Sequence, residues 1–258
     1  MESDRDFRHI LQKAAEYDLL SQYYKYLNPQ LHMMFYHRHL RYMNQAVSMM
    51  QFRSRSQSHG GMGTARIRMV HGAPSTSNVD IYINGNRIIK DFSYKEATDY
   101  MSVAPGKYQI DIYPAGNMES TIISRKVVVE AGRHYILAAA GLPDKERLFI
   151  FEDVDQLPEG EVKLRFIHLV SDLPEVDIGV HKGDVVFPKL AYKQATNYLA
   201  LSPMTVHLEV RAAGSNDIIL PLPNLKLMTN EIYTILLTGN VDSDTGVDAI
   251  SLSMKKGG

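Results

Sequence analysis

The C-terminal three quarters of the chain repeat themselves, and this repeat constrains the fold more than any other feature. YKEATDY at 94–100 recurs as YKQATNY at 192–198, and RIRMVH at 66–71 recurs as KLRFIH at 163–168. The offset is 97 residues, and it becomes 98 after one additional residue near His181. A period of this length is the size of a small domain, so the sequence predicts one domain present twice.

Both copies have the pattern of β-strands. Short β-branched runs alternate between apolar and polar residues and are separated by Gly, Pro and Asn. YQIDI at 108–112 and its counterpart VHLEV at 206–210 keep apolar residues at alternate positions, which is typical of half-buried antiparallel strands. Asn84-Gly85 predicts a tight hairpin, because both residues tolerate positive φ. Each copy holds about seven strands in about 77 residues, as expected of a small Greek-key sandwich.

The first 52 residues have a helical pattern instead. Apolar residues follow three-and-four spacing from residue 4 to residue 51, and Asn28-Pro29 interrupts them, so we expect an αα-hairpin. RSRSQSHGGMGT is then typical of a flexible linker.

The predicted fold class is mainly β, with two tandem antiparallel immunoglobulin-like β-sandwich repeats after an N-terminal helical hairpin. The predicted boundaries are 1–52 for the hairpin, 53–64 for the linker, 65–151 for repeat 1, 152–161 for a short linker and 162–258 for repeat 2.

The hairpin has more apolar surface than its two helices can bury on each other. Residues 1–64 hold five of the ten histidines, seven of the thirteen methionines and six of the fifteen tyrosines. Met33, Tyr36, Leu40, Met43 and Val47 form a second apolar face beside the first. The sequence therefore predicts a protein partner or self-association, of coiled-coil character, through residues 7–52. The predicted interface residues are Met34, Phe35, Tyr36, Tyr42, Met43 and Met49.

The order of motifs in the first copy resembles a known bacterial family. RIRMVHGAPSTSNVDIYING, the segment 94–100, VAPGKYQIDIYPAG and EAGRHYILAAAG together are similar to domain of unknown function 4397, and the resemblance extends over residues 65–239. In the second copy Met204 and Asn230 stand where the pattern has turn glycines. The resemblance implies immunoglobulin-like or transthyretin-like sandwiches, often in tandem in secreted or surface proteins. The family has no agreed activity, so it implies no site residues.

Two residue types recur in both copies and are the candidates for ligand binding. Tyr94, Tyr100, Tyr192 and Tyr198 either contact a ligand or bury their rings and hydrogen-bond a neighbouring loop, as in a tyrosine corner. His71 and His168 each end the first strand of a copy and are followed by Asp80 or Asp177. Such a pair could form a metal or acid–base site, or the histidine could bind a turn. We favour the structural interpretation for the histidines because catalytic sites are seldom duplicated within one chain, and for the tyrosines because they lie at a strand entrance in each copy.

Metal ligation has two weaker candidates. His32 and His39 share a helix face near several methionines, but His37 does not lie on it, so solvated or interface histidines are the favoured interpretation. Asp242 and Asp244 begin a segment that resembles a calcium loop, although its glycine comes one residue early and the closing acidic residue is missing. We favour a polar hairpin loop there, and the sequence predicts no cofactor and no metal.

Composition and motifs exclude several function classes. A net charge of −1 provides no electrostatic footprint for nucleic acid, and the absence of cysteine excludes disulfides and thiolate chemistry. No run of about 18 apolar residues predicts a transmembrane segment. Signatures such as G-x-S-x-G, H-E-x-x-H and phosphate-binding loops are missing, so we expect no enzyme. The N-terminus lacks the features of a secretory signal, so we expect synthesis in the cytosol. The family resemblance implies a surface setting, and assembly on the cell envelope or a spore surface satisfies both expectations.

These observations favour a non-catalytic structural or adhesion-like protein, with the hairpin as a docking or oligomerisation element. One alternative is a small-ligand or metal-binding protein that uses the His/Met/Tyr-rich hairpin. A second alternative is a hydrolase whose site is formed by the sandwich loops.

Overall fold

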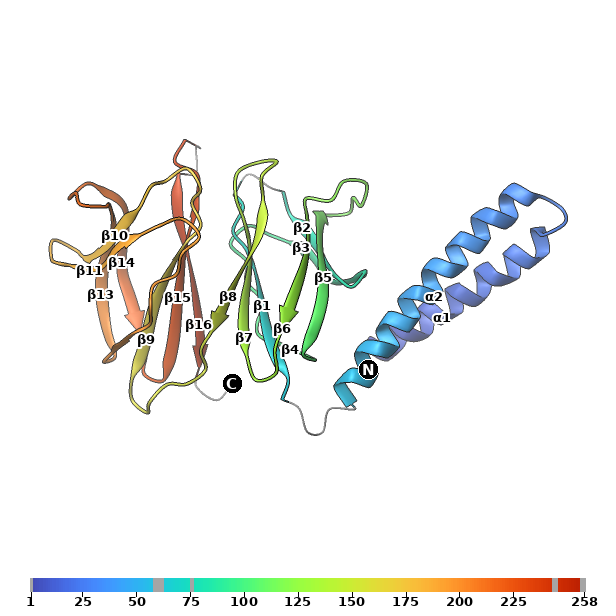
Figure 1. Ribbon diagram of the computed structural model, residues 1–258, viewed down its shortest axis with the longest axis horizontal. Coiled ribbons are helices and arrows are strands. Elements are labelled where there is room, and N and C mark those ends of the chain that lie inside the picture. Colours follow the sequence, from blue (N-terminus) through green and yellow to red (C-terminus); the bar gives the residue numbers. More distant parts are fainter. Residues whose placement is uncertain (1, 58–62, 75–76, 243–245, 256–258) are drawn as a thin grey trace.

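The computed structural model describes residues 2–57, 63–74, 77–242 and 246–255, and within the helices it describes the side chains of residues 8–43 and 46. It consists of a helical hairpin and two β-sandwiches (Figure 1). Helix α1 is Glu2–Tyr24 and α2 is Pro29–Gln57. The Asn28 Oδ1 accepts hydrogen bonds from the backbone N–H groups of Gln30 and Leu31, both at 3.1 Å. The dipeptide that interrupts the helical pattern is therefore the N-cap and first residue of α2.

Helix α2 extends further than the sequence predicted. It continues to Gln57, five residues into the segment expected to be a flexible linker. These five residues contain neither Gly nor Pro, and arginine and glutamine are good helix formers, so the helix has no local reason to end there. Most of the remaining linker, residues 58–62, lies outside the described residues.

The first repeat is an eight-stranded sandwich. Its strands are β1 Ala65–His71, β2 Val79–Ile83, β3 Asn86–Phe92, β4 Met101–Val103, β5 Gly106–Pro114, β6 Ile123–Val129, β7 His134–Ala140 and β8 Arg147–Asp153. They form two sheets with the orders β3-β2-β5-β6 and β4-β1-β7-β8. All strand pairs are antiparallel except β1 and β7, which are parallel. Strand β8 extends two residues beyond the predicted end of the repeat at residue 151.

The second repeat has the same topology. Its strands are β9 Val162–His168, β10 Val176–Val180, β11 Val185–Leu190, β12 Leu199–Leu201, β13 Met204–Ala212, β14 Ile218–Leu227, β15 Glu231–Gly239 and β16 Val247–Lys255. The sheet orders are β11-β10-β13-β14 and β12-β9-β15-β16, and β9 and β15 are again the parallel pair. The predicted fold class, two tandem sandwiches after a helical hairpin, is confirmed.

The Asn84-Gly85 hairpin is also confirmed. The two residues have φ of 51° and 78°, and they connect β2 to β3 where Ile83 pairs with Asn86. Positive φ at both central positions is the geometry that glycine and asparagine adopt most readily. The side chain of Asn84 also accepts a hydrogen bond from the N–H of Gln109 in β5 at 2.8 Å, which ties the turn to the next strand.

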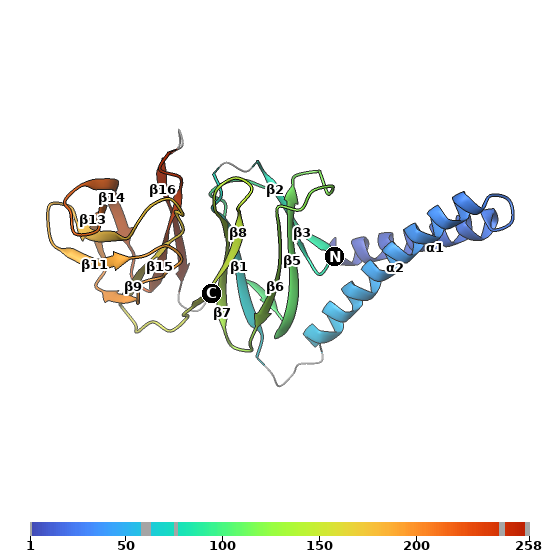
Figure 2. The same cartoon turned by 45° about the horizontal axis from the view of Figure 1, so that its top comes forward.

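The four sheets are stacked in four layers, so the two sandwiches form one body (Figures 1 and 2). Each sandwich encloses its own core. A third apolar core lies between the two inner sheets, β4-β1-β7-β8 and β12-β9-β15-β16. Its buried members are Val70, Ile136, Ala138, Ala140 and Phe149 of the first repeat and Ile167, Leu169, Leu236, Ile250 and Leu252 of the second. The same sheet of each repeat therefore provides the contact surface, and the two copies are related by an approximate two-fold arrangement.

Candidate functional site

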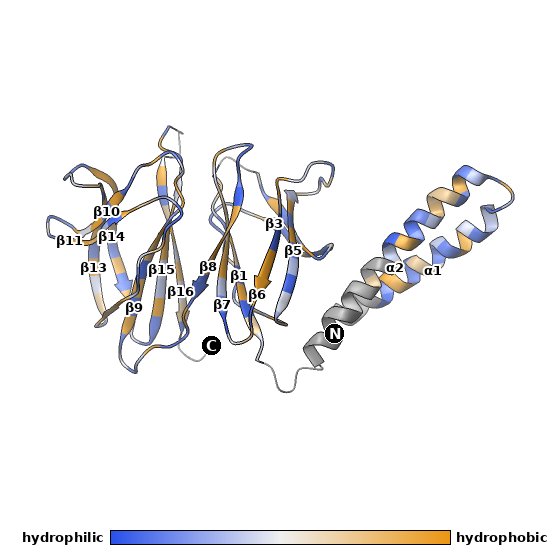
Figure 3. Ribbon diagram, viewed as in Figure 1, coloured by the Kyte–Doolittle hydropathy of each residue, from blue (hydrophilic) through white to orange (hydrophobic). Residues whose placement is uncertain are grey.

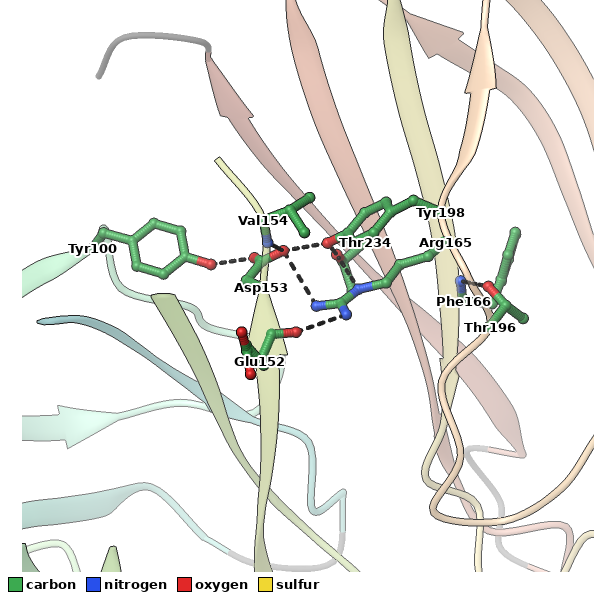
Figure 4. Close-up of polar contacts among 9 residues, drawn as sticks. All are labelled: Tyr100, Glu152, Asp153, Val154, Arg165, Phe166, Thr196, Tyr198 and Thr234. Carbon is green, nitrogen blue, oxygen red and sulfur yellow. Dashed lines mark hydrogen bonds and ion pairs between the residues drawn. The ribbon is translucent and has the colours of Figure 1, made fainter. Parts of the chain in front are cut away.

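A buried polar cluster lies at one end of the contact between the repeats (Figure 4). Its centre is Asp153, the last residue of β8, which is 8% exposed. The carboxylate accepts hydrogen bonds from the hydroxyls of Tyr100 and Tyr198. It also forms an ion pair with the Arg165 guanidinium at 3.2 Å and accepts the N–H of Val154 at 2.9 Å. One carboxylate thus holds together a tyrosine from each repeat.

An arginine covers each of these tyrosine rings. The Cζ of Arg68 lies 4.6 Å from the ring centroid of Tyr100, and the Cζ of Arg165 lies 4.5 Å from that of Tyr198. Both arginines are buried, and this cation–π geometry is favourable where water is excluded. Arginine and tyrosine occupy equivalent positions in the two repeats.

Each arginine also crosses to the opposite repeat. Arg68 of β1 donates to the carbonyl oxygen of Ser253 in β16 at 3.0 Å, and Arg165 of β9 donates to the carbonyl oxygen of Glu152 in β8 at 2.8 Å. The two bonds are related by the same approximate symmetry as the sheets. The arginines therefore fix the position of one sandwich relative to the other.

The cluster departs from symmetry at the carboxylate. Strand pairing places Met254 of β16 at the position equivalent to Asp153 of β8, so the second repeat has no equivalent acid. Thr234 adds a further polar group on one side, because its hydroxyl is 3.1 Å from the Arg165 Nε and 3.1 Å from the Tyr198 hydroxyl. Burial and the negative charge of Asp153 raise the pKa of both tyrosine hydroxyls, so these remain protonated donors. Four donors occupy the carboxylate, and the arrangement acts as a clasp between the repeats.

The other end of the contact uses the first tyrosine of each motif. The hydroxyls of Tyr94 and Thr238 are 3.1 Å apart, and Thr238 donates to the carbonyl oxygen of Gly72 at 3.0 Å. The ring of Tyr192 packs edge-on against Phe149, with 6.0 Å between centroids. All four candidate tyrosines therefore lie at the contact between repeats.

The expected tyrosine corner is formed by other residues. The Tyr108 hydroxyl donates to the carbonyl oxygen of Ala104 at 2.7 Å. The Tyr233 hydroxyl accepts the N–H of Met228 at 3.0 Å. These tyrosines lie inside a strand, where the hydroxyl can reach back to the preceding turn. The candidates at 94–100 and 192–198 instead lie in the connections that lead into β4 and β12, beside the other repeat.

His71 and His168 each bind a turn within their own repeat. The Nε2 of His71 donates to the Ser77 carbonyl at 3.4 Å, and that of His168 donates to the Pro174 carbonyl at 3.2 Å. In both cases Nδ1 accepts the N–H of the residue two positions later. Burial lowers the pKa of both imidazoles, more than the carbonyl contacts raise it. The two histidines are therefore neutral turn-binding groups near pH 7.

The aspartates that follow them bind a different part of the fold. Asp80 accepts the N–H groups of Asp91 at 2.9 Å and Gly116 at 3.3 Å, and Asp177 accepts the equivalent groups of Lys189 and Gly214. Burial raises the pKa of the Asp80 carboxyl, but these hydrogen bonds and Arg87 lower it overall. For Asp177 the bond from Gly214 is the largest cause of the lowered pKa. No described contact brings a histidine and an aspartate of this set together as an acid–base pair.

Two of the candidate metal ligands, His32 and His39, bind backbone carbonyls within the hairpin. His32 donates from Nδ1 to the Ser21 carbonyl at 2.9 Å, and His39 donates to the Ala14 carbonyl at 2.9 Å. Asp242 lies in the connection between β15 and β16, and Asp244 lies outside the described residues. Among the residues that the structure describes, no group of three or more acidic or histidine side chains is placed to hold a metal.

The predicted interface residues of the hairpin divide into two groups. Phe35 and Tyr42 are partly buried and stack on Tyr17 of α1, with centroids 6.2 Å and 5.4 Å away, so they pack between the two helices of the hairpin. Met34, Tyr36 and Met43 are exposed, and the side chain of Met49 lies outside the described residues. Sequence spacing alone did not separate the two groups, because Tyr36 and Met43 each follow a packed aromatic residue by one position and therefore have the same spacing along α2.

One exposed row of apolar side chains remains on α2, and we call it the α2 stripe. It consists of Met33, Tyr36, Leu40 and Met43, which are between 37% and 48% exposed. In Figure 3 the described part of α2 shows hydrophobic residues among hydrophilic ones along its length. None of the helices in the described part of the chain has the length and hydrophobicity needed to span a membrane.

Four residues of the contact between the repeats were not predicted from the sequence: Asp153, Arg68, Arg165 and Thr238. A signal for the arginines was present, since RIRMVH and KLRFIH both carry an arginine in the middle of an otherwise apolar strand. A charge retained at the same place in two buried strands indicates a specific partner. For Asp153 and Thr238 no such signal exists, because their counterparts in the other repeat are different residues.

Several solved structures match this chain at low sequence identity and low TM-score. The C-terminal domain of AlgF from P. aeruginosa is 14% identical, with a TM-score of 0.30, over 37% of this chain and 100% of that one. The Bacillus anthracis TIE protein is 14% identical, with a TM-score of 0.23, over 69% of this chain and 34% of that one. A fimbrial assembly protein from Parabacteroides distasonis ATCC 8503 is 9% identical, with a TM-score of 0.22, over 75% and 98%. Values this low carry no information about function.

The sequence comparisons are more specific. No curated protein matches the sequence significantly. The model of the family described as Domain of unknown function (DUF4397) matches residues 65–179, which comprise the first sandwich and strands β9 and most of β10 of the second. The family resemblance is thus confirmed for this segment: residues 65–179 match the DUF4397 family.

Proposed function

We propose that this protein is a non-catalytic structural and binding protein, in which the paired sandwiches form a rigid body and the helical hairpin docks onto a partner. The observation that supports this most is the α2 stripe, a row of apolar side chains with no cover among the described residues. Exposed apolar rows on a helix are typical of interaction surfaces.

The rigidity of the sandwich pair follows from its interface. Ten buried apolar side chains, together with the Asp153 clasp, join the inner sheets. Relative motion of the repeats would expose this core and separate buried charges from their partners. The pair therefore suits a spacer or a platform better than a hinge.

The reactive side chains of the sandwiches support a non-catalytic role. The candidates for acid–base chemistry, His71 and His168, bind carbonyl and N–H groups on both ring nitrogens. Asp80 and Asp177 hold backbone N–H groups. A general base needs a free lone pair directed at a substrate, and these groups use theirs within the fold.

The proposed setting is a surface layer of the cell, either the envelope or a spore surface. This proposal rests on the family resemblance and on the presence of a docking element. Fractionation of cells that produce the protein tests it, because recovery of all the protein from the soluble cytosol would contradict the setting.

The docking role can be tested in the full-length protein. In the double variant Tyr36→Glu/Leu40→Glu, two charges replace the centre of the α2 stripe, and Leu19→Glu is a matched control at a site on α1 that is 73% exposed. We expect the double variant to have the molar mass of a monomer, or to fail to assemble in the cell. The control should behave like the unmodified protein in both measurements. If the double variant and the control both behave like the unmodified protein, the hairpin is not a docking element.

A further inference from the structure

The hairpin has a defined register that leaves one face of α2 free. His32 and His39, seven residues apart on α2, donate to the carbonyls of Ser21 and Ala14, seven residues apart on α1. Between them Phe35 stacks on Tyr17. The side of α2 that faces α1 therefore has the spacing of a coiled-coil seam, and this seam is filled.

The α2 stripe is a second seam on the same helix. Each of its residues follows a residue of the filled seam by one position, which rotates it by about 100° around the helix. Met33, Tyr36 and Leu40 are spaced by three and then four residues, the repeat of left-handed coiled coils, and Met43 continues it. A helix in a four-helix bundle contacts two neighbours and needs two such seams. A two-helix hairpin supplies half of such a bundle.

Charge indicates which helix covers the stripe. By sequence, α2 (29–57) contains four arginines and no acidic residue, whereas α1 (2–24) contains five acidic and three basic residues. If α2 packed against α2 of another copy, like charges would face each other. If it packed against α1 of another copy, opposite charges would meet. In a bundle whose neighbouring helices are antiparallel, the second arrangement requires both hairpin tips to point the same way.

We propose that the occupant of the α2 stripe is a second copy of this chain, and that two hairpins form a four-helix bundle with their tips at the same end. Helix α2 of each copy then lies against α1 of the other. Both sandwich pairs emerge from the opposite end of the bundle. This inference rests on the docking function proposed above, and it specifies the partner and its orientation.

The first experiment measures molar mass by light scattering after size-exclusion chromatography of the full-length protein. We expect twice the chain mass of 29.2 kDa. Leu40→Glu should raise the dissociation constant about a hundredfold, because it places an unpaired carboxylate in the seam. Leu19→Glu, the matched control, should leave the mass unchanged. Raising the salt concentration should weaken the dimer, since opposite charges contribute to it.

The second experiment tests the orientation by cross-linking. The chain has no cysteine, so Tyr26→Cys introduces a single thiol in the turn between the helices, at a residue that is 88% exposed. A short bis-maleimide should join two such chains if the tips lie together. In the opposite orientation the tips would be about 35 Å apart, the length of a 23-residue helix. Met228→Cys, at an exposed site in the second sandwich, is the control and should not cross-link.

The outcomes separate this inference from the docking function. A dimer that cross-links at Tyr26→Cys and dissociates with Leu40→Glu supports the proposal. A dimer that does not cross-link there overturns the orientation. If the protein is a monomer, self-association is wrong. In that case, loss of cellular assembly in Tyr36→Glu/Leu40→Glu would still support docking to a different protein, and retention of assembly would overturn docking as well.

Discussion

The sandwich pair and the helical hairpin differ in how they cover elements that have two apolar faces. Each inner sheet has apolar residues on both faces, and duplication supplies a matching sheet to cover the second face. The hairpin has apolar residues on two faces of α2, but α1 covers only one of them. A repeated domain can therefore bury its contact surface within one chain, whereas the two-helix hairpin leaves one apolar face of α2 without cover among the described residues.

The largest effect is expected at the Asp153 clasp, where buried charged groups join the two repeats. Asp153→Ala should lower the free energy of unfolding by about 3–5 kcal/mol, because it leaves the buried Arg165 guanidinium without a counter-charge. Urea denaturation followed by far-UV circular dichroism measures this loss. Asp155→Ala removes an exposed carboxylate two residues away and should change stability by less than about 1 kcal/mol. Equal effects at both positions would show that the clasp is not enclosed.

Two adjacent leucines of β15 allow the stability contributed by the core between repeats to be compared with that of the core within a repeat. Leu236 faces the first repeat and Leu237 faces the second sandwich's own core, and both are fully buried. Leu236→Ala and Leu237→Ala should each cost about 2–5 kcal/mol, since each leaves a cavity in a packed core. Denaturation midpoints of the two variants make the comparison directly. A cost below about 1 kcal/mol for Leu236→Ala alone would mean that the repeats can separate or slide.

The turn-binding histidines should make the sandwich pair sensitive to mild acid. Because burial lowers the pKa of His71 and His168, the unfolded chain takes up protons below the ordinary value of 6.5 while the folded chain does not. Stability should therefore fall as the pH decreases from 6.5 towards the lowered pKa. His71→Asn and His168→Asn should each cost about 1–2 kcal/mol at pH 7.5 and reduce this slope.

Denaturation curves at pH 7.5 and at lower pH measure the cost and the slope. The exposed His37 on α2 provides the control, since His37→Asn removes an imidazole that is not enclosed. An unchanged slope in both sandwich variants would show that other groups cause the acid sensitivity.

The smallest effect is expected inside the hairpin. His32→Ala removes the donor to the Ser21 carbonyl and should destabilise the helices by about 0.5–1.5 kcal/mol, without affecting the sandwiches. Thermal melting followed at a helix-sensitive wavelength measures this change, and His37→Ala should leave the curve unchanged. A matching loss of stability in the β-sheet signal would mean that hairpin and sandwiches unfold together.

Local sequence explains why the elements could be predicted. Alternation along 108–112 defines which side chains of β5 face the core, and Asn84-Gly85 defines a turn that few other dipeptides adopt. Asn28-Pro29 separates the helices because proline fits the first turn of a helix and asparagine caps it. These effects act over a few residues, so they are visible without the fold.

The interface between the repeats could not be predicted in the same way. HYILAAA of β7 is buried along its entire length, and such a run predicts a strand that is covered on both faces. It does not indicate which element provides the cover. Asp153 meets Tyr100 and Tyr198, which are 53 residues before it and 45 residues after it. Only the packing of one inner sheet on the other brings these side chains together.

The sequence by itself determined the duplication, the order of strands and helices, and the apolar surplus of α2, because all three are periodic patterns along the chain. The tertiary structure alone decided that the repeated tyrosines of both motifs lie at the contact between repeats, that Asp153 accepts a hydrogen bond from one tyrosine of each repeat, and which face of α2 stays open. The physical reason is that hydrogen bonds and ion pairs in a buried interface depend on exact distances between distant segments, and periodicity carries no information about those distances.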